Sequence, residues 1–150
     1  MTSEGSLEEY AEKRHFENTP EPEPEYKETG MTRFVVQEHH AKHLHWDLRL
    51  EMEGVLKSWA VPKGPPEQPG VRRLAIQVED HPVEYIDFEG EIEEGQYGAG
   101  QVKIWDHGTY ELEERDAKKL TFVLHGQRLE GGYVLVHTRE DQWILLKRKG

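Results

Sequence analysis

Residues 33–61, RFVVQEHHAKHLHWDLRLEMEGVLKSWAV, carry the clearest fold signal in this chain. Three runs rich in β-branched, aromatic and alternating apolar residues predict three strands, and Glu53-Gly54 has the composition of a two-residue hairpin turn. The predicted strands are Arg33–Glu38, His45–Met52 and Val55–Val61. Because so short a turn joins only antiparallel strands, this region predicts an antiparallel sheet.

The second of these runs alternates between polar and apolar side chains, and on a strand the two sets face opposite ways. The polar set is His45, Asp47 and Arg49, and the apolar set is Trp46, Leu48 and Leu50. Burying an imidazole, a carboxylate and a guanidinium is costly unless they bind something, so the polar face indicates a binding or catalytic site. The alternative is the solvent-exposed face of an edge strand.

Six further runs of the same kind follow, and no long helical pattern separates them. They are Arg73–Val78, Gln101–Asp106, Thr109–Glu113, Leu120–His125, Tyr133–Thr138 and Trp143–Lys147. Glu140-Asp141 would form another tight turn, and the long connections Pro62–Gly70 and His81–Gly100 are expected to form walls of a site. The pattern predicts eight or nine strands in an antiparallel barrel or sandwich.

The chain has 150 residues, which suits one domain with a single core. It has no stretch of 18 apolar residues, and its N-terminus is acidic where a signal peptide would be basic, so we expect a cytoplasmic protein that is not bound to a membrane. The absence of cysteine excludes disulfides and thiolate metal sites. Histidine, aspartate and glutamate are then the available metal ligands.

The net charge of −11 argues against a protein that binds long duplexes through a basic surface. The charge is uneven, because residues 1–30 hold nine glutamates against Lys13, Arg14 and Lys27. The remaining chain is rich enough in lysine and arginine for a local basic cleft. This distribution favours a site that grips one or a few phosphates.

The N-terminal segment begins with a helix signal, since Ser6 and Glu9 form a capping box and the apolar residues that follow have helical spacing. The helix is expected to end at about Phe16. Residues 18–30 are rich in proline and glutamate, which predicts an extended strap or a flexible, disordered linker.

Four of the nine histidines lie between residues 39 and 45, a clustering that indicates a metal site. His39 can approach His45 and Asp47 from the preceding strand, which would give two imidazoles and a carboxylate around an open-sided metal. Such a triad suits Mn²⁺ or Zn²⁺ hydrolases and equally Fe²⁺ oxygenases.

Neighbouring cations favour the first of these classes. Arg49 lies on the same strand face, and Lys63, Arg73 and His81 lie in or beside the flanking connections. A phosphoryl site needs such donors and an oxygenase does not. Taken singly, Lys63 and Arg73 are more typical of solvated surface residues. His81 precedes a proline in a segment expected to turn, and Tyr85 follows one helical turn later.

Three blocks of the sequence strongly resemble the 3′-phosphoesterase domain of the bacterial end-joining DNA ligase D. They are FVVQEHHAKHLHWDLRLEMEGVLKSWAVPKGP, EDHPVEY and FEGEIEEGQYGAGQVKIWDHGTYE. The resemblance covers nearly the whole chain, and without a ligase or polymerase region it implies the stand-alone archaeal or bacterial form. It implies a mainly β, single-domain antiparallel barrel of about eight strands, with the short helix and strap (residues 1–30) packed on the site of the barrel domain (residues 31–150).

The resemblance also implies an activity, which is the Mn²⁺-dependent repair of DNA 3′ ends in non-homologous end joining. A 3′-terminal ribonucleoside is removed first (phosphodiesterase), and the remaining 3′-phosphate is then hydrolysed to a 3′-hydroxyl (phosphomonoesterase). Zn²⁺ and Co²⁺ are alternative metals. The implied partners are DNA 3′ ends and a separately encoded DNA ligase, and we expect a monomer.

The family's functional positions carry over to eleven residues of this chain. His39, His45 and Asp47 would hold the metal. The others are Gln37, Arg49, Lys63, Arg73, His81 and Tyr85 in the barrel domain, and Arg14 and Glu21 in the N-terminal segment. Arg49 and Arg73 would grip the phosphate, and His81, with an expected pKa near neutrality, would protonate the leaving oxygen. The chain has His15 where the family pattern has aspartate.

Two other functions remain open on the residues alone. One is a small β-barrel oxygenase or isomerase that uses the same open metal triad. The other is a non-catalytic module that binds DNA ends for repair partners.

Overall fold

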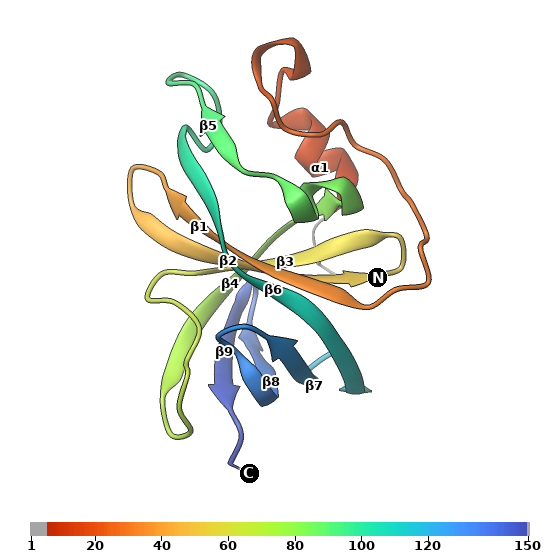
Figure 1. Cartoon of the computed structure of the whole chain (residues 1–150), viewed down its shortest axis with the longest axis vertical. Helices are drawn as coiled ribbons and strands as arrows, with labels where there is room; N and C mark the ends of the chain where they lie inside the picture. The colour runs from red at the N-terminus through yellow and green to blue at the C-terminus, as the bar shows by residue number, and fades with distance from the viewer. Residues whose placement is uncertain (1–5, 150) are drawn as a thin grey trace.

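The computed structural model describes residues 6–149, so residues 1–5 of the predicted N-terminal segment and residue 150 of the predicted barrel domain lie outside the described part. Within residues 6–149, nine antiparallel strands form one sheet in the order β1-β2-β3-β4-β9-β8-β7-β6-β5, and pairing of β1 with β6 closes eight of them into a barrel (Figure 1). The strands are β1 (Arg33–His40), β2 (Leu44–Met52), β3 (Val55–Val61), β4 (Arg72–Pro82), β5 (Gly90–Ile92), β6 (Gly100–Arg115), β7 (Lys119–Gly126), β8 (Glu130–Arg139) and β9 (Gln142–Lys147). The prediction of a mainly β, eight-stranded antiparallel barrel is confirmed. No described helix is long and apolar enough to cross a membrane.

The predicted tight turns form as expected. Glu53 and Gly54 both have positive φ, at 58° and 81°, as a two-residue turn between twisted strands requires. Glu140, with a φ of 51°, occupies the corresponding turn between β8 and β9.

Beyond small shifts at strand ends, three features of the strand pattern differ from the prediction. The two runs on either side of Gly108 form one long strand, β6, because this glycine does not turn the chain: a Cβ there would lie 2.0 Å from the carbonyl oxygen of His125, so it permits close approach of β7. Strand β4 runs on to Pro82, which places His81 in a strand where a turn was expected. Short β5 pairs with the start of β6 inside the predicted connection.

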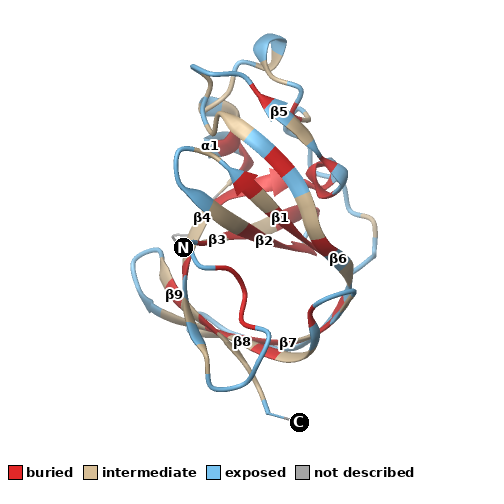
Figure 2. Cartoon of the chain, turned by 60° about the vertical axis from the view of Figure 1, so that its left-hand side comes forward, coloured by how far each residue is buried: buried red, intermediate tan, exposed pale blue. Residues whose placement is uncertain are grey.

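Alternation along β1 and β2 separates two apolar clusters. Buried residues are spread over the barrel strands and over segments that lie against them (Figure 2). Phe34, Val36, Leu48 and Leu50 face the barrel interior with the large aromatic core. Residues of the opposite parity, such as Val35, face outward. A second cluster therefore forms on the outside of the barrel, where other segments cover it.

That cover comes from the N-terminal segment and from the chain after β4. Helix α1 (Leu7–Glu12) is capped by Ser6, whose Oγ accepts a hydrogen bond from the backbone N–H of Glu9, as predicted. The helix ends at Glu12, earlier than expected, and a 3₁₀ turn (η1, Phe16–Asn18) follows. A second 3₁₀ helix (η2, Val83–Asp87) lies beside α1 on the outer cluster (Figure 1).

The strap, residues 19–32, contacts the helix and barrel along its length. The Tyr10 hydroxyl donates to the backbone oxygen of Pro22, the Lys27 N–H donates to the Gly54 carbonyl, and the Thr29 hydroxyl donates to Glu51. The segment is thus extended along the outer face (Figure 1).

Candidate active site

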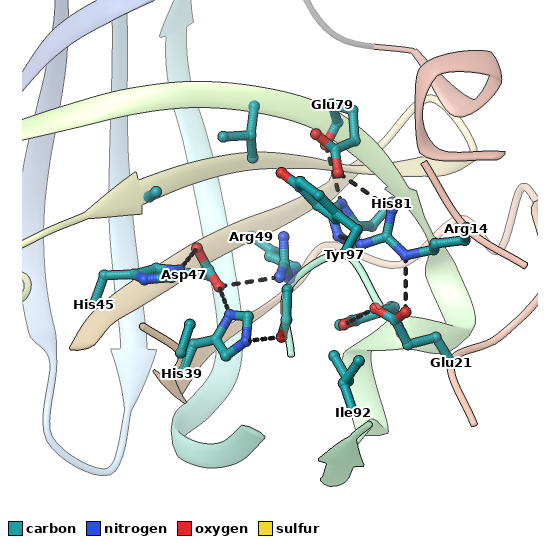
Figure 3. Close-up of a pocket in the computed structure, with 15 residues that line it drawn as sticks. Arg14, Glu21, His39, His45, Asp47, Arg49, Glu79, His81, Ile92 and Tyr97 are labelled. Carbon is teal, nitrogen blue, oxygen red and sulfur yellow. Dashed lines mark hydrogen bonds and ion pairs between the residues drawn. The ribbon is translucent and has the colours of Figure 1, made fainter. Parts of the chain in front are cut away.

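A pocket of about 270 Å³ lies on the outer face of the barrel, between the strands and their cover (Figure 3). Eight of the eleven residues proposed from the sequence line it: Arg14, Glu21, His39, His45, Asp47, Arg49, His81 and Tyr85. They come from the connection after α1, the strap, β1, β2, β4 and η2, so the fold gathers one pocket from six segments.

The metal-ligand candidates meet at Asp47 (Figure 3). Its Oδ2 lies 3.6 Å from Nδ1 of His39, and its Oδ1 lies 3.3 Å from Nε2 of His45. One ligand atom from each of the three residues can be chosen so that all lie within 4.8 Å of one another. Two nitrogens and a carboxylate oxygen at this spacing fit a divalent cation such as Mn²⁺ or Zn²⁺.

Backbone carbonyls orient both imidazoles. Nε2 of His39 lies 2.7 Å from the carbonyl oxygen of Gly98, and Nδ1 of His45 lies 3.0 Å from that of His43. Each ring would donate its N–H to the carbonyl and turn its other nitrogen toward Asp47. Metal-binding histidines are commonly held this way, because the hydrogen bond fixes the tautomer that presents a lone pair to the metal.

Asp47 stays ionised although it is buried. Burial alone would raise the pKa of its carboxyl group, but Arg49 and the two histidines outweigh that cost and hold the pKa well below its usual value. Burial also opposes protonation of His45, yet Asp47 raises the pKa of that imidazole. The anionic carboxylate is the form that binds a cation.

Arg49 stands next to the triad and is only 3 % exposed. Its Nη2 lies 3.4 Å from Oδ2 of Asp47, and its Nε donates to Oε1 of Gln37 over 2.6 Å. Its Nη1 is buried and has no hydrogen-bond partner within residues 6–149. Because an unpaired buried donor is costly, this atom marks a place for an external acceptor such as a phosphate oxygen.

Arg14 lies on the other side of the pocket between two carboxylates. Its Nε is 2.9 Å from Glu21, and its Nη1 is 3.3 Å from Glu79. Oε2 of Glu21 also accepts a hydrogen bond from the Tyr85 hydroxyl over 2.6 Å. These contacts join the N-terminal segment to β4 and η2 at the pocket.

His81 packs edge-on against Tyr85, with ring centroids 4.6 Å apart. Its Nδ1 lies 3.0 Å from the carbonyl oxygen of Glu79, and its Nε2 lies 3.5 Å from Nη2 of Arg14. Burial, together with the charges of Arg49 and Arg14, holds the pKa of His81 well below 6.5. The imidazole is therefore uncharged at pH 7. The sequence had led us to expect a pKa close to 7, and the pKa in the folded protein is lower than that.

Three of the proposed residues lie elsewhere. Gln37 is fully buried behind Arg49. Lys63 is exposed in the loop after β3, and Arg73 lines a separate shallow hollow with Pro65 and Glu67. Arg73 lies two positions before Ala75 on β4, so both side chains point to the same side of the strand. Ala75 faces the barrel interior, and Arg73 therefore points away from the pocket.

Sequence reasoning missed Glu79 and Tyr97, which also line the pocket. Glu79 is buried with Arg14 and Lys13, and these two cations outweigh the cost of burial and lower the pKa of its carboxyl group. Its neighbour Val78 also faces the pocket, and strict alternation would have sent one of the two inward. Val78 still pairs in register with Ser58, and the register shift lies between Val78 and His81, so this bulge allows Glu79 to face the pocket as well.

The pocket lining contains two guanidinium groups and three carboxylates, which gives a formal charge of −1 with neutral histidines. A bound divalent cation would change the sign to +1. The residues present thus fit a metal, and a bound metal would strengthen the attraction of the pocket for a phosphate.

Comparison with known families and proteins agrees with this geometry. The model of the DNA ligase D 3′-phosphoesterase domain matches residues 37–137. The multifunctional non-homologous end joining protein LigD of Pseudomonas aeruginosa is 48 % identical over 161 aligned positions, which cover 99 % of this chain and 19 % of that protein. The proteins of the same name in Mycobacterium bovis and Mycolicibacterium smegmatis are 48 % identical over 147 aligned positions and 44 % identical over 153. Both alignments cover 93 % of this chain, and they cover 19 % of the first protein and 20 % of the second.

The chain thus spans about a fifth of the length of the curated relatives it matches. The family match extends from Gln37 in β1 to His137 in β8, and it includes the three metal-ligand candidates, Arg49 and His81. This chain belongs to the family of the DNA ligase D 3′-phosphoesterase domain.

Proposed function

We propose that the protein is a metal-dependent phosphoesterase that processes DNA 3′ ends for non-homologous end joining. It would remove a 3′-terminal ribonucleoside and then the 3′-phosphate, with Mn²⁺ as the metal. The family supports the reaction class. The observation that carries the proposal is the buried, unpartnered Nη1 of Arg49 beside the triad of His39, His45 and Asp47.

His39, His45 and Asp47 would hold the metal, which when bound supplies Lewis-acid stabilisation of a phosphate oxygen. Arg49 would donate from Nη1 to a second oxygen of the same phosphate and stabilise charge that develops during attack by water. Gln37 keeps this guanidinium in place. Since the arginine is already oriented in the protein, little reorganisation is needed when substrate binds.

His81 would handle the proton on the leaving oxygen. In the first step that oxygen is O5′ of the ribonucleoside, and in the second it is O3′ of the primer. The imidazole is neutral before substrate binds, because Arg49 and Arg14 oppose a third positive charge. The negative charge of a bound phosphodiester or 3′-phosphate offsets these charges, so its arrival would raise the pKa of His81 and let the ring take up the proton that it then donates.

Arg14 and Glu21 would position the end of the DNA strand from the N-terminal side. A separately encoded ligase is the proposed consumer of the 3′-hydroxyl, and a monomer suffices, since one chain supplies every residue in this scheme.

The test is to incubate a primer-template that ends in one ribonucleotide with the protein and Mn²⁺, and to resolve the 3′ end over time on a denaturing gel. We expect the 3′-phosphate to appear first and the 3′-hydroxyl second. Asp47→Asn should be inactive. His40→Ala, which changes the exposed neighbour of His39 on the same strand, is the matched control and should remain active.

Two outcomes would favour other functions. Oxygen consumption with Fe²⁺ and no change at the DNA end would indicate an oxygenase. Tight binding of the primer-template without cleavage in Mn²⁺, Zn²⁺ or Co²⁺ would indicate a non-catalytic end-binding module.

A further inference from the structure

Tyr97 adds a partly exposed aromatic side chain to the pocket. It lies in the loop between β5 and β6, lines the pocket, and is 47 % exposed (Figure 3). The next residue, Gly98, provides the carbonyl that lies 2.7 Å from His39. The loop that carries Tyr97 is therefore tied to a metal-ligand candidate.

Two cations of the N-terminal segment lie against the Tyr97 ring. Nζ of Lys13 is 4.7 Å from the ring centroid and Cζ of Arg14 is 5.3 Å from it. The Lys13 ammonium also lies 3.4 Å from the Tyr97 hydroxyl. These contacts hold the ring while nearly half of the side chain remains open to solvent. An exposed ring held in this way is suited to stacking on a planar group such as a nucleobase.

The charge beside this ring indicates which part of a substrate it would meet. A second hollow adjoins the pocket at Val78 and Glu79, and Glu9 and Asp141 also line it. Lys13, the cation of this hollow, is already paired with Glu79 at 2.9 Å and with Glu9 at 3.6 Å.

An acidic hollow repels the successive phosphates of a primer strand. A 3′-terminal nucleoside has no phosphate beyond the one being cleaved, so it is the part of the substrate that this side of the pocket can accept.

We propose that Tyr97 is the platform on which the base of the 3′-terminal ribonucleoside stacks while its O5′ leaves the phosphate. The inference rests on the proposed function and adds a specificity-determining residue to it. A primer that ends in a 3′-phosphate has no base at this position. Tyr97 would therefore act in nucleoside removal and not in hydrolysis of the terminal phosphate.

The variants Tyr97→Ala and Tyr97→Phe test this with both substrates. Tyr97→Ala should slow nucleoside removal about tenfold or more, mainly through KM, the size expected for one lost base–aromatic stack, and leave 3′-phosphate hydrolysis unchanged. Tyr97→Phe keeps the ring and should retain both activities. Tyr26→Ala is the matched control, since Tyr26 is 66 % exposed and lies in the strap away from the pocket lining. An equal loss of both steps in Tyr97→Ala would overturn the proposal, because it would indicate general support of the site through Gly98 and His39.

Abasic substrates identify the base that stacks. Removing the base of the terminal ribonucleoside should slow the wild-type protein and abolish the difference between wild type and Tyr97→Ala. Removing the base of the penultimate nucleotide should preserve that difference. The reverse pattern would assign Tyr97 to the primer strand and overturn the proposal.

A binding measurement separates this inference from the proposed catalysis. The probe is a primer-template that ends in 2-aminopurine ribonucleoside through a non-hydrolysable methylenephosphonate linkage, with Mn²⁺ present. Stacking should quench the fluorescence with wild type and Tyr97→Phe but not with Tyr97→Ala. Quenching in a protein that hydrolyses no DNA end would support the platform while the phosphoesterase proposal failed, and its absence in wild type would overturn the platform itself.

Discussion

The side chain of Gln37 joins Arg49 to the chain that covers the pocket. Its Oε1 accepts from Nε of Arg49 over 2.6 Å, while its Nε2 donates to the backbone oxygens of Tyr85 and Phe88 at 2.8 and 3.1 Å. One fully buried amide thus orients the guanidinium proposed to bind phosphate and fixes η2 and the residue that follows it against the barrel. A non-titrating group with both a donor and an acceptor is needed at this point.

Gln37→Leu should therefore lower both stability and activity. The change leaves Nε of Arg49 and the Phe88 carbonyl without this partner, and the Tyr85 carbonyl keeps only its bond from the Phe88 N–H. The loss should cost about 3 kcal/mol of unfolding free energy. Urea denaturation measures this cost. Gln101→Leu, at an exposed position of β6, is the matched control and should stay within about 0.5 kcal/mol of the parent. Equal stability of the two variants would show that Gln37 does not hold this junction.

Loss of any one metal-ligand candidate should abolish Mn²⁺ binding and both end-processing steps, because an open three-ligand site cannot spare a ligand. The variants are His39→Ala, His45→Ala and Asp47→Asn, and titration calorimetry reads metal binding directly. Their circular dichroism should match the parent, since the triad lies outside the barrel interior. Undiminished Mn²⁺ affinity in any variant would remove that residue from the coordination shell.

The neutral state of His81 should make stability depend on pH. Its pKa in the folded protein lies well below 6.5, so below pH 6.5 the unfolded chain binds a proton that the folded one refuses, and stability falls as the pH falls. For this one group the slope is at most about 1.4 kcal/mol per pH unit. Unfolding free energies measured from pH 7 to pH 5 should decline less steeply in His81→Gln than in the parent, and parallel curves would contradict the assignment.

Nuclear magnetic resonance provides an internal comparison for the same prediction. The His81 ring should remain neutral at pH 6.5. His125 lies exposed between Glu111 and Glu130, whose hydrogen bonds raise its pKa, so its ring should be mostly protonated at that pH.

Deleting residues 1–30 should lower activity, with ribonucleoside removal affected more than phosphate removal, because the larger diester needs more positioning contacts. Arg14 and Glu21 line the pocket, and Leu7 and Tyr10 belong to the outer apolar cluster, so the deletion should lower stability as well. Glu21→Gln, which keeps the segment but removes the charge facing Arg14, separates the two effects. If the segment were only an acidic tail, its deletion would raise DNA affinity and leave turnover intact.

The antiparallel strands and the faces of the early strands were determined by local sequence, whereas the choice between a barrel and a sandwich depended on the pairing of β1 with β6. Period-two alternation in β2 assigns Leu48 and Leu50 to the interior and Asp47 and Arg49 to the outer face, because successive side chains of a strand point in opposite directions whatever surrounds them. The turn at Glu53-Gly54 likewise depends only on the backbone freedom of adjacent residues.

The tertiary structure alone decided which distant groups complete the pocket. Glu79 faces the pocket through a bulge that shifts the register of β4. Arg73 lies in the regular part of the same strand and points to the same side as Ala75, away from the pocket. Tyr97 and the Gly98 carbonyl arrive from a loop nearly sixty residues after His39. The low pKa of His81 requires burial together with two arginines from other segments. Each of these depends on strand register and on packing between segments far apart in the chain, which no local pattern specifies.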